Sequence, residues 1–193
     1  MHYNSSGQCP VGADLSTFQE RLRAVDNPRR MIESLPVSLA EKTLVLRSLA
    51  ETEALAARLA RLAVAGDVLA LAGGLGAGKT AFARGFIRAR AGADGVAEVP
   101  SPTFTLVQVY ELPGAPVWHF DLYRLARPDD AWELGIEDAF AEAISLVEWP
   151  DRLGALLPEA RLDLELTIGD GEARQAKLAG RGSWAARLDA LHV

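Results

Sequence analysis

Cysteine is nearly absent from this chain: Cys9 is the only one among 193 residues. A single thiol cannot form an internal disulfide, and its surroundings match no spacing of metal ligands. Long apolar runs are also missing, because no stretch approaches the roughly 18 residues of a membrane-spanning helix. The first residues lack the basic and then apolar order of a secretion signal. We therefore expect a protein of the reducing cytoplasm with no membrane segment.

Positive charge is outnumbered by negative charge. The formal net charge is −6, so the surface as a whole does not attract polyanions. No run of Lys and Arg with interleaved aromatic residues appears, so a dedicated nucleic-acid surface is not expected. The apolar content of 49% and the charged content of 24% are ordinary for a globular protein. The length suits a single domain with a sizeable core.

One glycine-rich stretch is the strongest feature that is present. Residues 73–80 fit the pattern G-x-x-x-x-G-K-[ST], between an apolar run at 68–72 and helix-forming residues at 81–87. Glycines let backbone N–H groups approach phosphate oxygens, and the following helix N-terminus favours negative charge. Lys79 is expected at the β- and γ-phosphates and the Thr80 hydroxyl at Mg²⁺. The nucleotide-binding residues predicted from this motif are Gly73, Gly74, Leu75, Gly76, Ala77, Gly78, Lys79, Thr80 and Ala81.

Two carboxylates end short apolar segments farther along the chain. Asp121 ends a strand expected over 117–121, and Glu148 ends another expected over 144–148. P-loop enzymes hold Mg²⁺ with an acid at the end of a buried strand, and ligands of open α/β sheets collect at the carboxyl ends of strands. Either acid alone could be a solvated strand end. Together they predict that at least one serves the metal, without deciding which.

A hydroxyl-rich segment precedes these strands. Two prolines give residues 99–110 a stiff start, and the alternation from Phe104 onward indicates a strand. Such a loop after a P-loop helix is either a switch that senses the γ-phosphate, with Thr103 in it, or a plain turn. The pattern leaves both interpretations open.

The N-terminal residues differ from the rest. Residues 1–42 are polar and interrupted by Gly and Pro, so we expect a loosely attached extension. The alternative is a docking helix that Asp14 caps. A first strand is expected over 43–47, followed by a helix that begins with the capping-box pair Ser48 and Glu51.

The C-terminal part predicts a helix over 128–140, a half-exposed antiparallel strand over 162–168, a returning strand over 173–178 and a last helix capped by Ser183. The Gly-Asp-Gly between the two strands is a hairpin signal. Residues 43–193 are therefore expected to form a single-domain α/β P-loop NTPase. Its sheet would be mixed and mostly parallel, flanked by helices, with an antiparallel C-terminal hairpin.

Five segments of this chain resemble, in order, the TsaE family, formerly called YjeE. They are 73–85, 101–107, 119–125, 133–135 and 146–150, and the likeness runs from about Ser48 to Leu166. The resemblance implies a small cytoplasmic Mg²⁺-dependent ATPase of bacterial tRNA threonylcarbamoyladenosine (t6A) biosynthesis. Such proteins bind the TsaD–TsaB complex and allow its repeated catalytic cycles at adenosine 37. They meet tRNA only through that complex and do not transfer the threonylcarbamoyl group themselves.

The resemblance also implies roles for particular residues. Lys79, Asp121 and Glu148 would be catalytic, with Thr80, Glu148 and Asp121 at Mg²⁺. Asp121 would assist at the metal or orient the attacking water. The remaining nucleotide contacts would come from Thr103, Trp149, Glu51 and Thr52, the last two on the adenine side. Gly74 departs from the family pattern, which usually has Asp there, and nucleotide binding is expected to survive this change.

Hydrolysis would proceed by in-line attack of water on the γ-phosphate of ATP. The sequence assigns no arginine finger; Arg84 and Arg124 are candidates, each more simply interpreted as a structural ion pair. We therefore expect a slow ATPase whose site the partner complex completes. One alternative is a small-molecule or nucleotide kinase, which needs an acceptor pocket and a mobile lid. A second is a non-catalytic module that only binds nucleotide.

Overall fold

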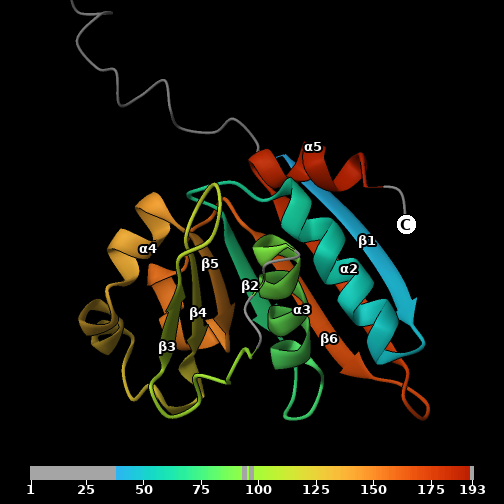
Figure 1. Ribbon diagram of the computed structural model, residues 1–193, viewed down its shortest axis with the longest axis horizontal. Helices are drawn as coiled ribbons and strands as arrows, with labels where there is room; N and C mark the ends of the chain where they lie inside the picture. The colour runs from blue at the N-terminus through green and yellow to red at the C-terminus, as the bar shows by residue number, and fades with distance from the viewer. Residues whose placement is uncertain (1–37, 93–94, 96–97, 192–193) are drawn as a thin grey trace, which may run out of the picture. The chain divides into compact units, whose positions relative to one another are not determined.

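The computed structural model describes residues 38–92, 95 and 98–191, all within the unit Val37–Val193. The expected extension up to residue 37, with the helix predicted after Asp14, lies outside the described residues. One seven-stranded sheet has the order β1-β7-β6-β2-β5-β4-β3 (Figure 1). The strands are β1 (Leu39–Leu46), β2 (Val68–Ala72), β3 (Val107–Tyr110), β4 (Val117–Asp121), β5 (Ile144–Glu148), β6 (Leu162–Ile168) and β7 (Arg174–Arg181).

The helices are of two kinds. Four α-helices are described: α2 (Leu49–Leu62), α3 (Lys79–Ala91), α4 (Ile136–Glu142) and α5 (Ser183–Asp189). Three 3-10 helices follow strands or loops: η2 (Leu122–Arg124), η3 (Pro128–Leu134) and η4 (Pro150–Leu156). Among the described residues, no helix is long and apolar enough to cross a membrane.

Strand direction positions the functional edge of the sheet. The strand pairs β2–β5, β2–β6 and β4–β5 are parallel, whereas β1–β7, β6–β7 and β3–β4 are antiparallel. Strands β1, β6, β2, β5 and β4 therefore point the same way, and β7 and β3 run opposite. The prediction of a single α/β domain with a mixed, mostly parallel sheet and an antiparallel C-terminal hairpin is confirmed.

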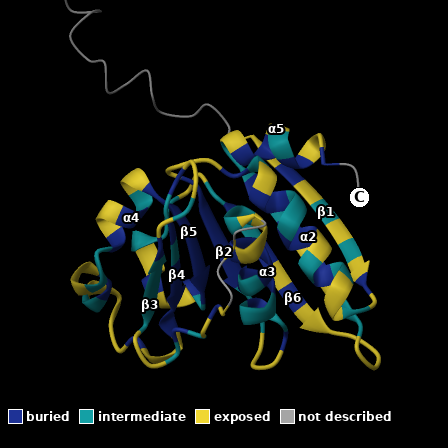
Figure 2. Cartoon of the chain, in the orientation of Figure 1, coloured by how far each residue is buried: buried dark blue, intermediate teal, exposed yellow. Residues whose placement is uncertain are grey.

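Burial follows from the strands' positions. Residues of β5 and nearly all of β2 are buried, whereas in β1 exposed residues alternate with buried or half-buried ones (Figure 2). Near-continuous apolar runs are typical of parallel strands that are covered on both faces. Helices α2 and α3 lie side by side over one face, where Phe82 and Phe86 pack with Leu69 and Leu146. On the other face, Phe120 and residues of η3, α4 and η4 form a second core.

The first strand begins earlier than expected. It starts at Leu39 rather than at residue 43, because the whole of β1 pairs with β7, from Leu39 opposite Arg181 to Leu46 opposite Arg174. The polar residues Glu41 and Lys42 do not look like part of a strand, yet they lie on an edge strand with one solvated face. The Ser48 hydroxyl caps α2 as predicted by accepting the Glu51 N–H, but the Glu51 carboxylate accepts the N–H of Arg47 instead of completing the reciprocal box.

Four further elements differ wholly or partly from expectation. The strand expected from Phe104 begins at Val107, and Phe104 lies in a turn with its ring exposed. The helix expected over 128–140 is divided at Gly135, which has a φ of 74° and so interrupts the helical backbone. Strand β6 is antiparallel to β7 but parallel to β2, and Ser183 is the first residue of α5 rather than its cap.

Candidate functional site

The glycine-rich loop joins the carboxyl end of β2 to the first turn of α3, as the motif requires. Gly73 has a φ of 135°, and a Cβ there would lie 2.2 Å from the carbonyl oxygen of Leu166 on β6. No other residue type fits this close approach. At Gly74, by contrast, a Cβ would meet nothing within 4 Å. The departure from the family's Asp at that position therefore leaves the packing of the loop unchanged.

Lys79 is folded over the loop. Its Nζ donates to the carbonyl oxygens of Gly73, at 2.7 Å, and Gly74, at 2.9 Å. The same ammonium lies 3.9 Å from the centroid of the Trp149 ring, close enough for a cation–π interaction. Burial lowers the pKa of Lys79, and the charges of Glu148 and Asp121 oppose that shift. The cation is thus held at the loop by carbonyls, an aromatic face and acids.

Glu148 is held through both of its oxygens. Its Oε2 accepts the Thr80 hydroxyl at 3.0 Å, and its Oε1 lies 2.9 Å from Nε2 of His119. His119 is fully buried, and its Nδ1 has no partner among the described residues. A carboxylate only accepts hydrogen bonds, so the proton belongs on Nε2.

Asp121 lies directly opposite Glu148 in the register of β4 and β5, on the same face of the sheet. Its Oδ2 accepts the Thr103 hydroxyl at 2.8 Å, and its Oδ1 accepts the N–H of Tyr123 at 3.2 Å. Thr103 in turn lies 2.8 Å from the Ser101 hydroxyl. The hydroxyl-rich segment is therefore joined to the end of β4 through the very acid that the sequence singled out.

Two non-glycine residues near these acids have left-handed backbone conformations. Leu106 has a φ of 64° and Trp149 a φ of 60°, a region that costs side-chain-bearing residues free energy. Leu106 donates its N–H to Pro102 and accepts the N–H of Asp121, which anchors the segment from both ends. The turn at Trp149 places its ring 4.9 Å from that of Tyr123. Strained residues of this kind cluster at functional sites.

These side chains enclose a cavity of about 250 Å³ at the carboxyl edge of the sheet. It brings together most of the residues that the sequence assigned to nucleotide and metal. The lining residues are Leu75, Gly76, Gly78, Lys79, Thr80, Ala81, Thr103, Asp121, Tyr123, Glu148 and Trp149.

A second cavity, of about 370 Å³, lies beside the same loop. It shares Gly76, Gly78 and Ala81 with the first, and Thr52 of α2 contributes to its wall. The remaining lining residues are Leu49, Gly171, Glu172 and Arg174. The two cavities therefore meet at the residues of the glycine-rich loop that they share.

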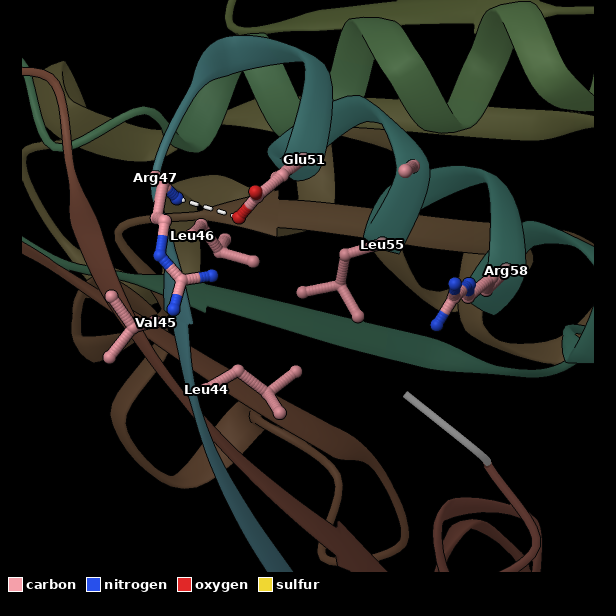
Figure 3. Close-up of a pocket in the computed structure, with 8 residues that line it drawn as sticks. Leu44, Val45, Leu46, Arg47, Glu51, Leu55 and Arg58 are labelled. Carbon is pink, nitrogen blue, oxygen red and sulfur yellow. Dashed lines mark hydrogen bonds between the residues drawn. The ribbon is translucent and has the colours of Figure 1, made fainter.

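Glu51 lies elsewhere. Its carboxylate bonds the Arg47 N–H and belongs to a groove between edge strand β1 and α2, together with Leu44, Leu55 and Arg58 (Figure 3). Glu51 is not among the described residues that line either cavity beside the loop, whereas its neighbour Thr52 is. One helical step of about 100° separates the directions of these two side chains.

The two candidate finger arginines make local contacts. Arg84 donates through Nε to the carbonyl of Val99 at 2.8 Å. The Arg124 guanidinium lies 4.7 Å from the centroid of the Phe104 ring. Neither lines the cavity that contains Lys79 and Glu148, and no other arginine does so in the described part of the chain.

Sequence reasoning gave no role to two polar residues that the structure brings to the site. His119 lies on the same face of β4 as Asp121, two residues away, and this alternation was a usable signal. Arg174 begins β7, far from the motif in sequence, and its Nε bonds the Ala77 carbonyl of the loop at 3.1 Å. Nothing in the local sequence around Arg174 indicates that contact, because it depends on the pairing of β6 with β7.

The arrangement suits a phosphorylated ligand together with a hard cation. Loop N–H groups and a helix N-terminus favour phosphate oxygens. A hydroxyl and two carboxylates, from Thr80, Glu148 and Asp121, supply the oxygen ligands that Mg²⁺ prefers. The residues present therefore fit both a nucleoside triphosphate and Mg²⁺.

Comparisons with known proteins agree on one family. Residues 46–176 match the family model described as "Threonylcarbamoyl adenosine biosynthesis protein TsaE". The Rickettsia felis protein named tRNA threonylcarbamoyladenosine biosynthesis protein TsaE is 34% identical over 150 residues, covering 78% of this chain and 86% of that protein. The Bacillus subtilis protein of the same name is 36% identical over 134 residues, covering 69% of this chain and 82% of that protein.

A solved structure gives the same result at the level of the fold. The crystal structure of Bacillus subtilis YdiB superimposes with a TM-score of 0.65 at 29% sequence identity. The superposition covers 78% of this chain and 93% of YdiB.

The contact between His119 and Glu148 leads to a testable stability difference. His119→Leu leaves Glu148 Oε1 buried without its donor, so the free energy of unfolding should fall by about 1–3 kcal/mol. His119→Gln keeps an amide N–H at a similar reach and should lose clearly less. Urea denaturation of the two variants beside wild type measures both. An equal loss in the two variants would mean that ring packing, and not the hydrogen bond, is what His119 contributes.

Proposed function

This chain belongs to the TsaE family of tRNA threonylcarbamoyladenosine biosynthesis proteins, and from that premise we propose that it is a Mg²⁺-dependent ATPase of the cytoplasm. We propose further that it acts with the TsaD–TsaB complex, allowing that complex to complete repeated cycles of t6A formation at adenosine 37. It would reach tRNA only through the complex.

The observation that carries this proposal is the hydrogen bond between Thr80 and Glu148, with Asp121 beside them. The first residues of α3 and the ends of β4 and β5 thereby present three oxygen groups at one edge of the sheet. Thr80 directly follows Lys79, so its hydroxyl brings Glu148 next to the glycine-rich loop. P-loop hydrolases use this combination of a hydroxyl and a strand-end acid at the metal.

Each residue has a distinct part in the proposed hydrolysis. The loop N–H groups and Lys79 would bind the β- and γ-phosphates, and Lys79 would exchange its bonds to Gly73 and Gly74 for phosphate oxygens. Glu148 and Thr80 would hold Mg²⁺, which neutralises charge on the phosphates when bound. Asp121, next to Thr103 of the hydroxyl-rich segment, would assist at the metal or orient the water that attacks the γ-phosphate in line.

The base of ATP would occupy the second cavity. Thr52 and Leu49 of α2 and the hairpin residue Glu172 line that cavity together with residues of the loop, and Glu148 does not line it. The family resemblance placed Glu51 and Thr52 on the adenine side. The place of Thr52 in the lining of this cavity supports an adenine-side role for that residue. Glu51 does not line the cavity and would contribute only by stabilising the start of α2.

The need for a partner is supported by the rim of the site. Leu75 at the tip of the loop is 78% exposed and Phe104 is 83% exposed, large apolar side chains of the kind that partners cover. The positive charge that stabilises phosphoryl transfer in many P-loop enzymes comes from an arginine supplied in cis or in trans. We propose that the TsaD–TsaB complex covers this rim and completes the site.

Glu148→Gln tests the chemistry of the proposed site. The amide keeps the shape but loses the charge that holds the metal, so turnover should fall about 100-fold or more while ATP binding persists. Phosphate release without an added acceptor, together with calorimetric ATP binding, measures the two properties. Phosphate release that needs an acceptor would favour a kinase instead. Full partner function in Glu148→Gln would indicate a module that only binds nucleotide.

The dependence on a partner predicts a rate effect. Saturating TsaD–TsaB should raise the ATPase rate of this protein by about tenfold or more, because the partner supplies charge or closes the site. Phe104→Ser should weaken that stimulation with little change in the rate of the protein alone. The hypothesis of a completed site fails if the rate stays the same at every concentration of the complex.

A further inference from the structure

We infer that Arg174 holds the glycine-rich loop in the conformation that binds phosphate. This inference rests on the proposed function and names a positioning residue for it. Arg174 is the first residue of β7, and its position opposite both Leu46 of β1 and Ile168 of β6 places it at the same edge of the sheet as the loop.

The guanidinium connects two backbone segments. On the loop side, the Nε of Arg174 donates to the carbonyl oxygen of Ala77 at 3.1 Å. Its Nη2 lies 3.5 Å from the carbonyl oxygen of Gly76. On the hairpin between β6 and β7, its Nη1 donates to the carbonyls of Ala173, at 2.8 Å, and Glu172, at 3.1 Å. The planar group thus spans from the hairpin to the loop with donors on both sides, a geometry that lysine cannot reproduce.

The contact with Ala77 orients the next amide. In a trans peptide the carbonyl and the N–H point in opposite directions from one plane. Because the Ala77 carbonyl faces Arg174, the N–H of Gly78 faces away from it. Arg174 lines the second cavity but not the one containing Lys79 and Glu148, whereas Gly78 lines both. The Gly78 N–H is thereby directed toward the side where phosphate oxygens would lie.

Such an orientation needs a restraint in this loop. Gly76 and Gly78 have φ angles of 76° and 110°, and glycine visits other backbone regions with little steric penalty. A rotated peptide would turn the Ala77 carbonyl toward the phosphate and remove a donor from it. The N–H of Ala77 is already used by the Gly74 carbonyl. Arg174 is therefore a group outside the loop that favours the productive peptide, and its positive charge also favours a bound polyanion.

The test compares two arginines of the same strand. Arg174→Met removes the contact with the loop, whereas Arg181→Met removes an arginine at the far end of β7 that pairs with Asp163. Binding of ATP and of inorganic tripolyphosphate is measured by calorimetry on the full-length proteins. Arg174→Met should weaken tripolyphosphate binding about tenfold or more, and Arg181→Met should change it less than about twofold.

Two further measurements separate positioning from charge and from general stability. Arg174→Lys keeps the charge without the planar donor pair, so it should recover less than half of the lost binding free energy. The Gly78 amide resonance in ¹⁵N-labelled protein should shift in Arg174→Met and stay unchanged in Arg181→Met. Steady-state kinetics should show a raised KM with a smaller change in kcat.

Several results would overturn the inference. Wild-type tripolyphosphate affinity and an unshifted Gly78 resonance in Arg174→Met would do so, as would an equal loss in Arg181→Met. Full recovery in Arg174→Lys would show that charge alone matters. Failure of the proposed function itself is seen separately, as unchanged ATP binding in Lys79→Ala, a variant that leaves Arg174 and its contacts in place.

Discussion

The parallel pairing of β2 with β5, and of β5 with β4, is the constraint on which the site depends. Because these strands run in one direction, the glycine-rich loop after β2, Asp121 at the end of β4 and Glu148 at the end of β5 meet at one edge. The hydrogen bond from Thr80 to Glu148 then joins the first turn of α3 to the sheet. If one of these pairs changed direction or register, the hydroxyl and the acids would separate and no common site would exist.

Around that edge, the protein maintains conformations that are unfavourable in isolation. Trp149 adopts a positive φ, Lys79 is buried, and Gly73 approaches the backbone of β6 too closely for any side chain. Each is offset locally: Trp149 packs on Tyr123 and on the Lys79 ammonium, and Lys79 bonds two loop carbonyls. This concentration of strain and buried charge at one place is typical of sites prepared for a ligand.

Much of this arrangement was predictable from local pattern. The bounds of β2, β4, β5 and β6 follow from apolar runs and alternation, and the loop motif predicts the place of Lys79 and Thr80. The start of β1 could not be predicted in this way, because its polar residues form a strand only by pairing with β7. The roles of His119 and Arg174 depend on contacts between residues distant in sequence, which no local pattern encodes. Glu51 and Thr52 are neighbours in sequence but line different cavities. Which cavity each residue lines depends on the orientation of α2 in the fold, which the sequence pattern does not give.

We propose that this site hydrolyses ATP in the service of repeated rounds of tRNA modification. The most direct test is t6A formation by TsaD and TsaB from threonylcarbamoyl-adenylate and unmodified tRNA, with and without this protein and Mg-ATP. We predict a single turnover in its absence, multiple turnovers in its presence, and no such gain with Lys79→Ala. Modification that stays the same on addition of the wild-type protein, under conditions where it binds ATP, would contradict the claim.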